Sequence, residues 1–266
     1  MKRFILGCAA ALAVVALAPT AASATVTPGV QTVTEGAQCT ANFIFRDGGG
    51  TYVGQAAHCS GTGAATETDG CDSASLPIGT PVEVSGATQP GTLVYNSWIT
   101  MQQGVESDAD TCAFNDFALV RLGAADAAAV DPSVPGFGGP TGVADPPSNA
   151  GATVFTYGNS SLRGGVTKLS PKQGVVVQEQ GGGWSRDVYT ATPGIPGDSG
   201  SGFMDGSGRA IGVLSTVQIA PLAASNGVGN LNRELAYARA HGFGGLNLVP
   251  GTKPFNGDLV NAIIGA

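Results

Sequence analysis

Short apolar or alternating segments, each ended by Gly, Pro, Asn or Asp, recur along the chain and constrain its fold more than any other feature. Such spacing is typical of strands in a sandwich or barrel, and not of alternating strands and helices. One segment instead has helical periodicity, with Leu231, Leu235 and Ala238 on one face and Gly242 as a stop. The sequence therefore predicts an all-β fold with a helix near 231–241. The expected strands are 41–45, 81–84, 91–94, 117–122, 152–157, 174–178, 187–190 and 210–216.

A stretch dense in Pro and Gly, residues 131–150, has little periodicity. We interpret it as a linker between two halves, each large enough for a small barrel. The predicted organisation is a first half over residues 25–135 and a second half over 136–266, which also carries the helix and a tail.

Residues 1–24 have the pattern of a secretory signal peptide. A short basic start precedes an apolar run over 4–17, and Ala22-Ser23-Ala24 matches the small-residue cleavage pattern. The run is too short for a spanning helix, and no later stretch reaches about 20 apolar residues. We therefore expect removal of residues 1–24, export of the remainder to the extracellular space, and no membrane association afterwards.

Four cysteines remain after that cleavage, because Cys8 lies in the apolar run. An even number in an exported chain favours two disulfides, with three pairings open in principle. The four are Cys39, Cys59, Cys71 and Cys112.

The segment 196–202, of sequence PGDSGSG, is the strongest candidate for chemistry. A nucleophilic serine on a tight turn, here Ser199, presents its hydroxyl, and glycines beside it let backbone amides approach a ligand. The amides of Gly197 and Ser199 could form an oxyanion hole, and Asp198 needs a partner if it is buried. The alternative is an ordinary glycine-rich turn, since the chain has 42 glycines.

Two further residues could complete a catalytic triad. His58 follows the strand-like segment 51–55 and stands beside a cysteine that can tether its loop. A neutral imidazole there can take the serine proton and return it to a leaving amine. Asp116, which precedes an apolar strand, could hold the ring N–H of His58 and fix its tautomer. The only other histidine, His241, ends the predicted helix, where a structural or surface role is expected.

Three segments, QAAHC at 55–59, NDFALVRL at 115–122 and GDSGSG at 197–202, together resemble the chymotrypsin-like (trypsin-type) serine peptidases, in a divergent bacterial secreted branch. They stand in the family's order, His, Asp, Ser. Between them the resemblance is only to a β-rich pattern, so it rests on about 20 residues.

The resemblance implies two packed six-stranded antiparallel β-barrels with the active site between them and a C-terminal helix. It assigns His58 as general acid and base, Asp116 as its orienting partner and Ser199 as nucleophile, with the amides of Gly197 and Ser199 as oxyanion hole. It also implies a Cys39–Cys59 disulfide, which leaves Cys71 to pair with Cys112.

The sequence departs from the family at the partner of Asp198. Animal members pair this aspartate with a freed N-terminal amine, but no Ile-Val-Gly-Gly type start appears near residue 25. Some bacterial members use an internal arginine or other donors of a loop in the second barrel. The corresponding region here is 157–163, so Arg163 or Asn159 is the predicted partner.

The specificity pocket departs as well. Pro193 stands where trypsin-type members carry a pocket-base aspartate, and Val217 replaces a glycine common at the pocket mouth. Ser215 and Thr216 belong to the segment along which substrate backbone would add as a strand, and Ser215 would also approach Asp116. We predict cleavage after small or modest apolar residues, and neither after Lys or Arg nor after Glu.

The net charge of the chain limits the kinds of partner it can bind. A net charge of −7 argues against nucleic acid or an anionic membrane as partner. If Cys71 and Cys112 pair, two acidic loops could meet and invite calcium, but we interpret them as solvated loop charge and expect neither a metal nor a cofactor. The expected partners are polypeptide substrates, and the expected state is a monomer. The acidic residues concerned are Glu67, Asp69, Asp72, Asp108 and Asp110.

The leading functional hypothesis is a serine endopeptidase that acts on extracellular polypeptides through an acyl-enzyme on Ser199. A catalytically silent binding module on the same fold is the second hypothesis, favoured only by the missing partner of Asp198. An esterase-like hydrolase with the same triad is the third. An unrelated β-rich adhesin or wall protein would require all three motifs to be coincidental.

Overall fold

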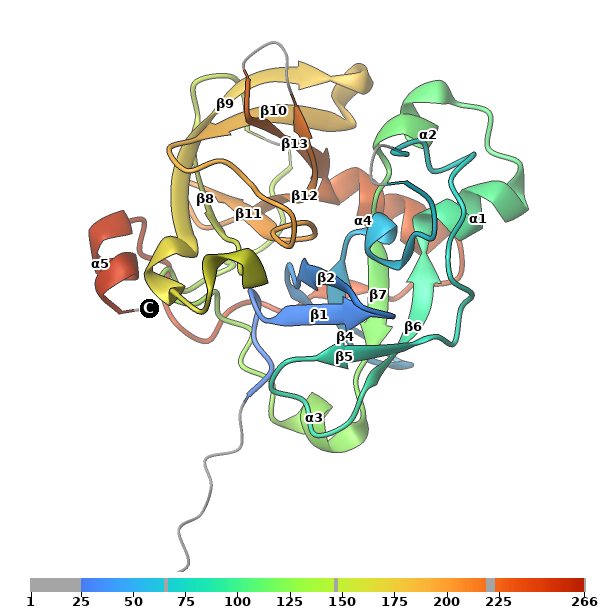
Figure 1. Ribbon diagram of the computed structural model, residues 1–266, viewed down its shortest axis with the longest axis horizontal. Coiled ribbons are helices and arrows are strands. Elements are labelled where there is room, and N and C mark those ends of the chain that lie inside the picture. The colour runs from blue at the N-terminus through green and yellow to red at the C-terminus, as the bar shows by residue number, and fades with distance from the viewer. Residues whose placement is uncertain (1–24, 65–66, 146–147, 219–222, 266) are drawn as a thin grey trace, which may run out of the picture.

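The computed structural model describes residues 25–64, 67–145, 148–218 and 223–265, and its fold is mostly β (Figure 1). A closed barrel, yellow to orange, lies against a second sheet that is blue to green. The predicted signal peptide lies outside the described residues and stays a prediction. Among the described helices, none is both long and apolar enough to cross a membrane.

The first half forms an eight-stranded antiparallel sheet that the hydrogen-bond order leaves open. We expected a closed six-stranded barrel; the observed sheet has two more strands, one of which is the C-terminal strand β14, paired with β3 at one edge. In order across the sheet the strands are β14 (Asn247–Leu248), β3 (Ile44–Asp47), β4 (Gly50–Gln55), β7 (Ala118–Arg121), β6 (Gly91–Asn96), β5 (Pro81–Val84), β1 (Gln31–Thr34) and β2 (Ala37–Thr40).

The second half forms the six-stranded barrel that the resemblance implied. It closes because β9 pairs with β8 on one side and β10 on the other. Around the barrel the strands are β10 (Ser185–Thr190), β13 (Ser225–Asn230), β12 (Ala210–Gln218), β11 (Gly202–Asp205), β8 (Thr153–Tyr157) and β9 (Pro171–Gln180).

The predicted helix is α4 (Leu231–Ala240), followed by Gly242 at a φ of +103°. Four further α-helices were not predicted. Each has eight residues or fewer, too short to show periodicity, and a local side-chain cap starts three of them; Asn96, for example, accepts from the amides of Trp98 and Ile99. These helices are α1 (Ser97–Gly104), α2 (Ala109–Phe114), α3 (Ala124–Ala128) and α5 (Leu259–Ile264), and the 3₁₀ turns are Ala57–Ser60, Ser161–Arg163, Thr167–Leu169 and Gly181–Gly183.

Seven of the eight predicted strands coincide with observed ones over most of their length. The exception is 41–45, where β3 begins only at Ile44. Before it, the side chain of Asn42 accepts a hydrogen bond from the N–H of Phe43, so that this N–H is not available to a neighbouring strand. The strands β11 and β13, GFMD and SNGVGN, lack an apolar run, and pairing within the barrel holds them.

The predicted linker connects the two halves. Its described residues, 131–145 and 148–150, form isolated β-bridges but no helix or longer strand. The division at 135/136 stays a prediction, while β14 returns from the C-terminal end to the first sheet.

One hydrophobic cluster continues from the first sheet through α4 into the barrel. Phe45 and Phe117 of the first half stack edge to face, with ring centroids 5.4 Å apart, and both are fully buried. Leu231 and Leu235 of α4 and Val213 of β12 complete the same cluster. Because Phe117 directly follows Asp116, this core fixes the position of that aspartate at the boundary of the two halves.

Candidate active site

His58 and Asp116 are joined by two hydrogen bonds. His58 lies in the 3₁₀ turn Ala57–Ser60, and its Nδ1 lies 2.6 Å from Asp116 Oδ2. The backbone N–H of His58 donates to the other oxygen, Oδ1, at 2.9 Å. The carboxylate therefore orients both the ring and the backbone of one residue, which assigns the ring proton to Nδ1 and leaves Nε2 as the basic nitrogen.

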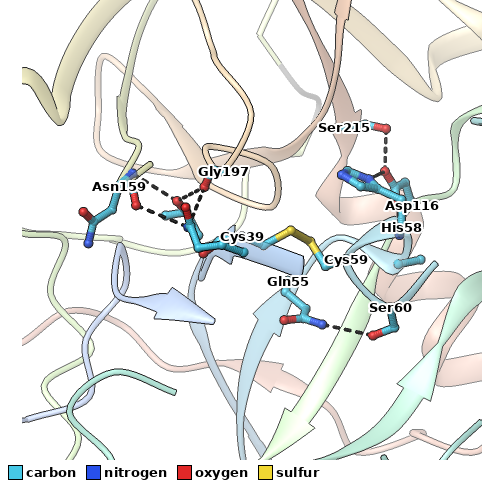
Figure 2. Close-up of a disulfide and its surroundings, with 12 residues drawn as sticks. Cys39, Gln55, His58, Cys59, Ser60, Asp116, Asn159, Gly197 and Ser215 are labelled. Carbon is cyan, nitrogen blue, oxygen red and sulfur yellow. Dashed lines mark hydrogen bonds and ion pairs between the residues drawn. A yellow bond between two sulfur atoms is a disulfide. The ribbon is translucent and has the colours of Figure 1, made fainter. Parts of the chain in front are cut away.

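Ser215 binds the same carboxylate from the second half. Its hydroxyl donates to Asp116 Oδ2 at 2.5 Å, and Figure 2 shows the three residues together. The predicted approach of Ser215 to Asp116 is thus present, and it holds β12 against the first sheet.

Burial and charge shift the pKa values of His58 and Asp116 in opposite directions. Burial acts to lower the pKa of His58, but the charge and hydrogen bond of Asp116 outweigh it and raise the pKa above its ordinary value. Burial likewise acts to raise the pKa of Asp116, which the charge and hydrogen bonds of His58 and the Ser215 hydroxyl bring below its ordinary value. The pair is therefore suited to stabilise an imidazolium.

Glu234 is a second buried carboxyl near Asp116 that sequence reasoning missed, because it sits at an ordinary position in the first turn of α4. Burial raises its pKa well above the ordinary value, and the charge of Asp116 raises it further. Burial therefore favours the neutral form of Glu234, whereas the contacts of Asp116 favour its charged form.

Ser199 lies on a tight turn that opens into the same cavity as His58. The cavity has a volume of about 770 Å³ and is lined by both residues, by the Cys39–Cys59 disulfide and by Trp98. Ser199 is half-buried, its carbonyl accepts from the N–H of Thr40 at 2.8 Å, and the following amide, of Gly200, donates to Leu214 at 2.7 Å. The loop is thus held from both halves.

Gly197 and Gly200 are required by the backbone here. Gly197 has a φ of +96° at the third position of a turn closed by the N–H of Asp198 and the carbonyl of Ile195 at 2.9 Å. A Cβ on Gly200, whose φ is +84°, would lie 2.6 Å from the carbonyl oxygen of Thr40. The N–H groups of Gly197 and Ser199 make no hydrogen bond to any other described residue, as an oxyanion hole requires.

Asp198 is fully buried and binds two cations. Arg163 contacts it with both terminal nitrogens, at 2.6 and 2.7 Å, and Lys172 Nζ lies 2.5 Å from Oδ2. The predicted partner Arg163 thus contacts Asp198, whereas Asn159 does not; its side chain donates to the carbonyl of Gly29. Burial acts to raise the pKa of Asp198, but the Arg163 and Lys172 interactions hold it below its ordinary value.

Lys172 was not singled out from the sequence. It is 3% exposed and lies at the start of β9, whereas lysines are almost never fully buried unless paired. A lysine just before the apolar stretch 175–177 was the available signal. Burial lowers its pKa, as does the charge of Arg163, while Asp198 opposes both.

Three of the four predicted specificity residues line the cavity, and one does not. Ser215, Thr216 and Val217 line the cavity, whereas Pro193 is absent from its wall, and the carbonyl of Pro193 instead faces Lys172 Nζ at 3.3 Å. The cavity also contains Glu67, from the loop after His58.

Both disulfides pair as the resemblance implied. Cys39–Cys59 joins β2 to the turn that carries His58, and Cys71–Cys112 joins the loop after His58 to α2. Figure 2 shows the first bond between the Gly197 region and the His58 region. These cysteines also make up two clusters of metal-ligand type among the described residues, Cys39 with His58 and Cys59, and Asp69 with Cys71 and Cys112, but in each the two sulfurs are bonded to each other.

Two of the acidic loop residues, Asp69 and Asp108, accept hydrogen bonds from residues close to them in sequence. Asp69 accepts from the N–H of Cys71, and Asp108 caps α2 through the N–H and hydroxyl of Thr111. These contacts give the carboxylates a structural role in their own loops.

The two cations of Asp198 should be mutually dependent. We expect Arg163→Met or Lys172→Met alone to lower the free energy of unfolding by about 1–3 kcal/mol, because one cation remains. The double variant should lose more than the sum, since it leaves a buried carboxylate uncompensated. Urea unfolding at neutral pH measures all three.

Lys253→Met is the matched control, because it breaks the more exposed Lys253–Asp131 pair and should cost below about 1 kcal/mol. Single variants of Arg163 and Lys172 that behave like this control, with an additive double, would contradict the assignment.

The pKa of His58 should depend on Asp116. In wild-type protein we expect it above the ordinary value of about 6.5, and below that value in Asp116→Asn, where burial acts without the opposing charge. NMR titration of the imidazole C–H signals measures both, since the chain has only two histidines. The signal of His241, stacked on Tyr237 at the exposed end of α4, serves as internal reference. Equal titration of His58 in the two proteins would show that Asp116 does not set it.

Comparison with known proteins gives the fold its context. No protein-family model and no curated protein sequence matches the chain. Solved structures do match. Thermobifida fusca protease A is 20% identical, over 86% of this chain and 100% of that chain, with a TM-score of 0.57. Cellulomonas bogoriensis chymotrypsin is 18% identical, over 85% and 98%, with a TM-score of 0.53.

A third match is described as a glutamic-acid-specific serine protease that uses a histidine triad in substrate binding. It is 18% identical, over 84% of this chain and 100% of that chain, with a TM-score of 0.51. All three matches cover nearly the whole of the known protein. The chain described here therefore has the chymotrypsin-like fold of the bacterial serine proteases.

Proposed function

We propose that the protein is a secreted serine endopeptidase in which Ser199 is the nucleophile, His58 the general acid and base, and Asp116 its orienting partner. The observation that carries this proposal is the Asp116–His58 hydrogen bond beside a cavity that also holds Ser199 and two backbone N–H groups, of Gly197 and Ser199, that find no acceptor within the described residues. The silent binding module was favoured only by the missing partner of Asp198, which here contacts Arg163 and Lys172. An esterase would use the same catalytic residues, so its substrates must distinguish it.

The geometry supports an acyl-enzyme mechanism. Nε2 of His58 takes the proton of the Ser199 hydroxyl as its oxygen bonds to the substrate carbonyl carbon. The oxyanion formed there would accept from the N–H groups of Gly197 and Ser199. His58 then gives the proton to the leaving amine as the C–N bond breaks, and water, activated in the same way, releases the acid and restores Ser199.

Three side chains crowd Gly194, and two of them, Leu214 and Val217, line the cavity with it, which supports the proposed preference for small apolar residues. A Cβ placed on Gly194 would lie 2.6 Å from Asn226 Oδ1, 3.2 Å from Leu214 Cδ2 and 3.5 Å from Val217 Cγ2. No acidic residue is among the three, so nothing there would bind a lysine or arginine side chain.

Cleavage after glutamate is disfavoured as well. The glutamic-acid-specific neighbour is described as using a histidine triad for its substrate. This chain has two histidines in all, and one of them, His241, is exposed at the end of α4.

Labelling with a fluorophosphonate tests the function. We expect one adduct, mapped to Ser199, because only a serine with an assembled base and oxyanion hole reacts readily. Ser199→Ala should abolish labelling, and Ser207→Ala, which removes an exposed serine of the barrel, should leave it unchanged. Folded protein without an adduct would favour the binding module. An adduct with hydrolysis of ester but not amide substrates of equal sequence would favour the esterase.

Val217→Gly tests the specificity. Removing this side chain opens the space over Gly194, so we expect the kcat/KM ratio for cleavage after Phe relative to Ala to rise about 10-fold or more. Peptide pairs that differ at this one position measure the ratio. An unchanged ratio, or wild-type cleavage confined to sites after Lys or Arg, would refute the proposed preference.

A further inference from the structure

Ser160 controls the orientation of one peptide bond next to the proposed nucleophile. Its hydroxyl donates to the carbonyl oxygen of Pro196 at 2.5 Å. Among the described residues the only cis peptide is Gly139–Pro140, so the peptide between Pro196 and Gly197 is trans, and its C=O and N–H point in opposite directions. With the carbonyl held by Ser160, the N–H of Gly197 is directed away from Ser160.

The turn sequence favours this orientation, and an outside contact adds to that preference. Residues 195–198 form a β-turn with Pro196 second and Gly197 third. The φ of Gly197, +96°, identifies the turn as type II, which takes proline at the second position and glycine at the third, whereas a type I turn has a negative φ at its third position. The two types differ by a flip of the central peptide, which would replace the N–H of Gly197 by the carbonyl of Pro196. Because glycine can adopt either sign of φ, the flipped turn stays accessible, and an external contact on this peptide stabilises one orientation against the other.

Ser160 is well placed to be that contact. Its hydroxyl oxygen accepts from the N–H of Leu162 at 3.1 Å, which leaves its single hydrogen for Pro196. The backbone N–H of Ser160 donates to Asp198 Oδ1 at 3.2 Å, and the residue is 2% exposed. Ser160 thus contacts the central peptide of the turn and, at its end, the carboxylate that binds Arg163.

The next peptide is held from the other side. The carbonyl of Gly197 accepts from the hydroxyl of Thr40 at 2.7 Å and from Gln38 Nε2 at 3.0 Å. These two donors belong to β2 of the first half, whereas Ser160 belongs to the second. The carbonyl of Pro196, by contrast, accepts a hydrogen bond from one described residue, and that residue is Ser160.

We propose that Ser160 is a positioning residue that keeps the Pro196–Gly197 peptide in the orientation needed for the oxyanion hole and couples it to the buried Asp198 ion pairs. This inference rests on the proposed function, because it concerns a donor of that reaction. Ser160 itself touches no substrate; it acts through the amide of Gly197.

Kinetics of Ser160→Ala provide the test. Loss of a whole oxyanion donor costs about 10²–10³ in kcat. The variant keeps the donor but frees its peptide to rotate, so we expect kcat to fall about 10- to 100-fold with KM within about twofold. Ser160→Thr, which retains a hydroxyl, should restore most of the loss, and Ser160→Cys, a weaker donor, should fall between them.

Ser185→Ala is the matched control, because it removes another buried hydroxyl that donates to a backbone carbonyl of the same barrel, that of Val228. Its kcat should equal that of the wild type. Equal kcat for Ser160→Ala and Ser185→Ala, or a change in KM alone, would overturn the proposal. If Ser160→Ala does not fold, the order of kcat among wild type, Ser160→Thr and Ser160→Cys decides.

A readout of the peptide itself separates positioning from general stability. Labelling with carbonyl-¹³C proline and ¹⁵N glycine restricts an NMR spectrum to the six Pro–Gly pairs of the chain, and loss of one signal in Gly197→Ala identifies Gly197. A peptide boronic acid should shift this signal in the wild type, and Ser160→Ala should show a second or displaced signal before inhibitor is added. An unchanged signal in Ser160→Ala would overturn the proposal, whereas a wild type inert to fluorophosphonate would instead refute the proposed function.

Discussion

The buried charge of Asp198 is the interaction on which the rest of the site depends. A carboxylate with no exposed surface is costly unless cations and N–H groups surround it, and here Arg163 and Lys172 both bind it. Its neighbours in sequence are Gly197 and Ser199, so fixing this side chain fixes the turn that presents the proposed nucleophile. Both cations come from the second half, the same half that carries the turn.

Contacts across the boundary of the two halves assemble the remaining parts. The Ser215 hydroxyl of β12 reaches Asp116 in the first half, and the N–H of Thr40 in β2 reaches the carbonyl of Ser199. The close approach at Gly200 excludes any side chain there. The proposed triad is therefore a property of how two sheets pack, and the continuous cluster through Phe117 and α4 makes that packing rigid.

The two buried carboxyl groups near His58, those of Asp116 and Glu234, differ in their electrostatic surroundings. Burial and the charge of Asp116 raise the pKa of Glu234 well above its ordinary value, whereas His58 and the Ser215 hydroxyl bring the pKa of Asp116 below its own. That arrangement favours an imidazolium during reaction without requiring an unusual base in the resting protein.

The candidate catalytic residues could be inferred from the sequence because each lies in a short, recognisable segment. His58, Asp116, Ser199 and the glycines around the serine occupy motifs in which neighbouring residues carry the signal, and α4 is long enough to show its period. The β-rich class followed from the spacing of turn residues for the same reason.

Only the tertiary structure decided what depends on residues far apart in the chain. Lys172 and Ser160 reach the Asp198 turn across 26 and 36 residues, and neither position has a local pattern that marks it. The closure of the second sheet, the addition of β14 to the first, and the absence of Pro193 from the cavity wall likewise follow from long-range packing. A sequence motif specifies which groups can react, whereas burial and distance, which determine how those groups are held, exist only once the chain has folded.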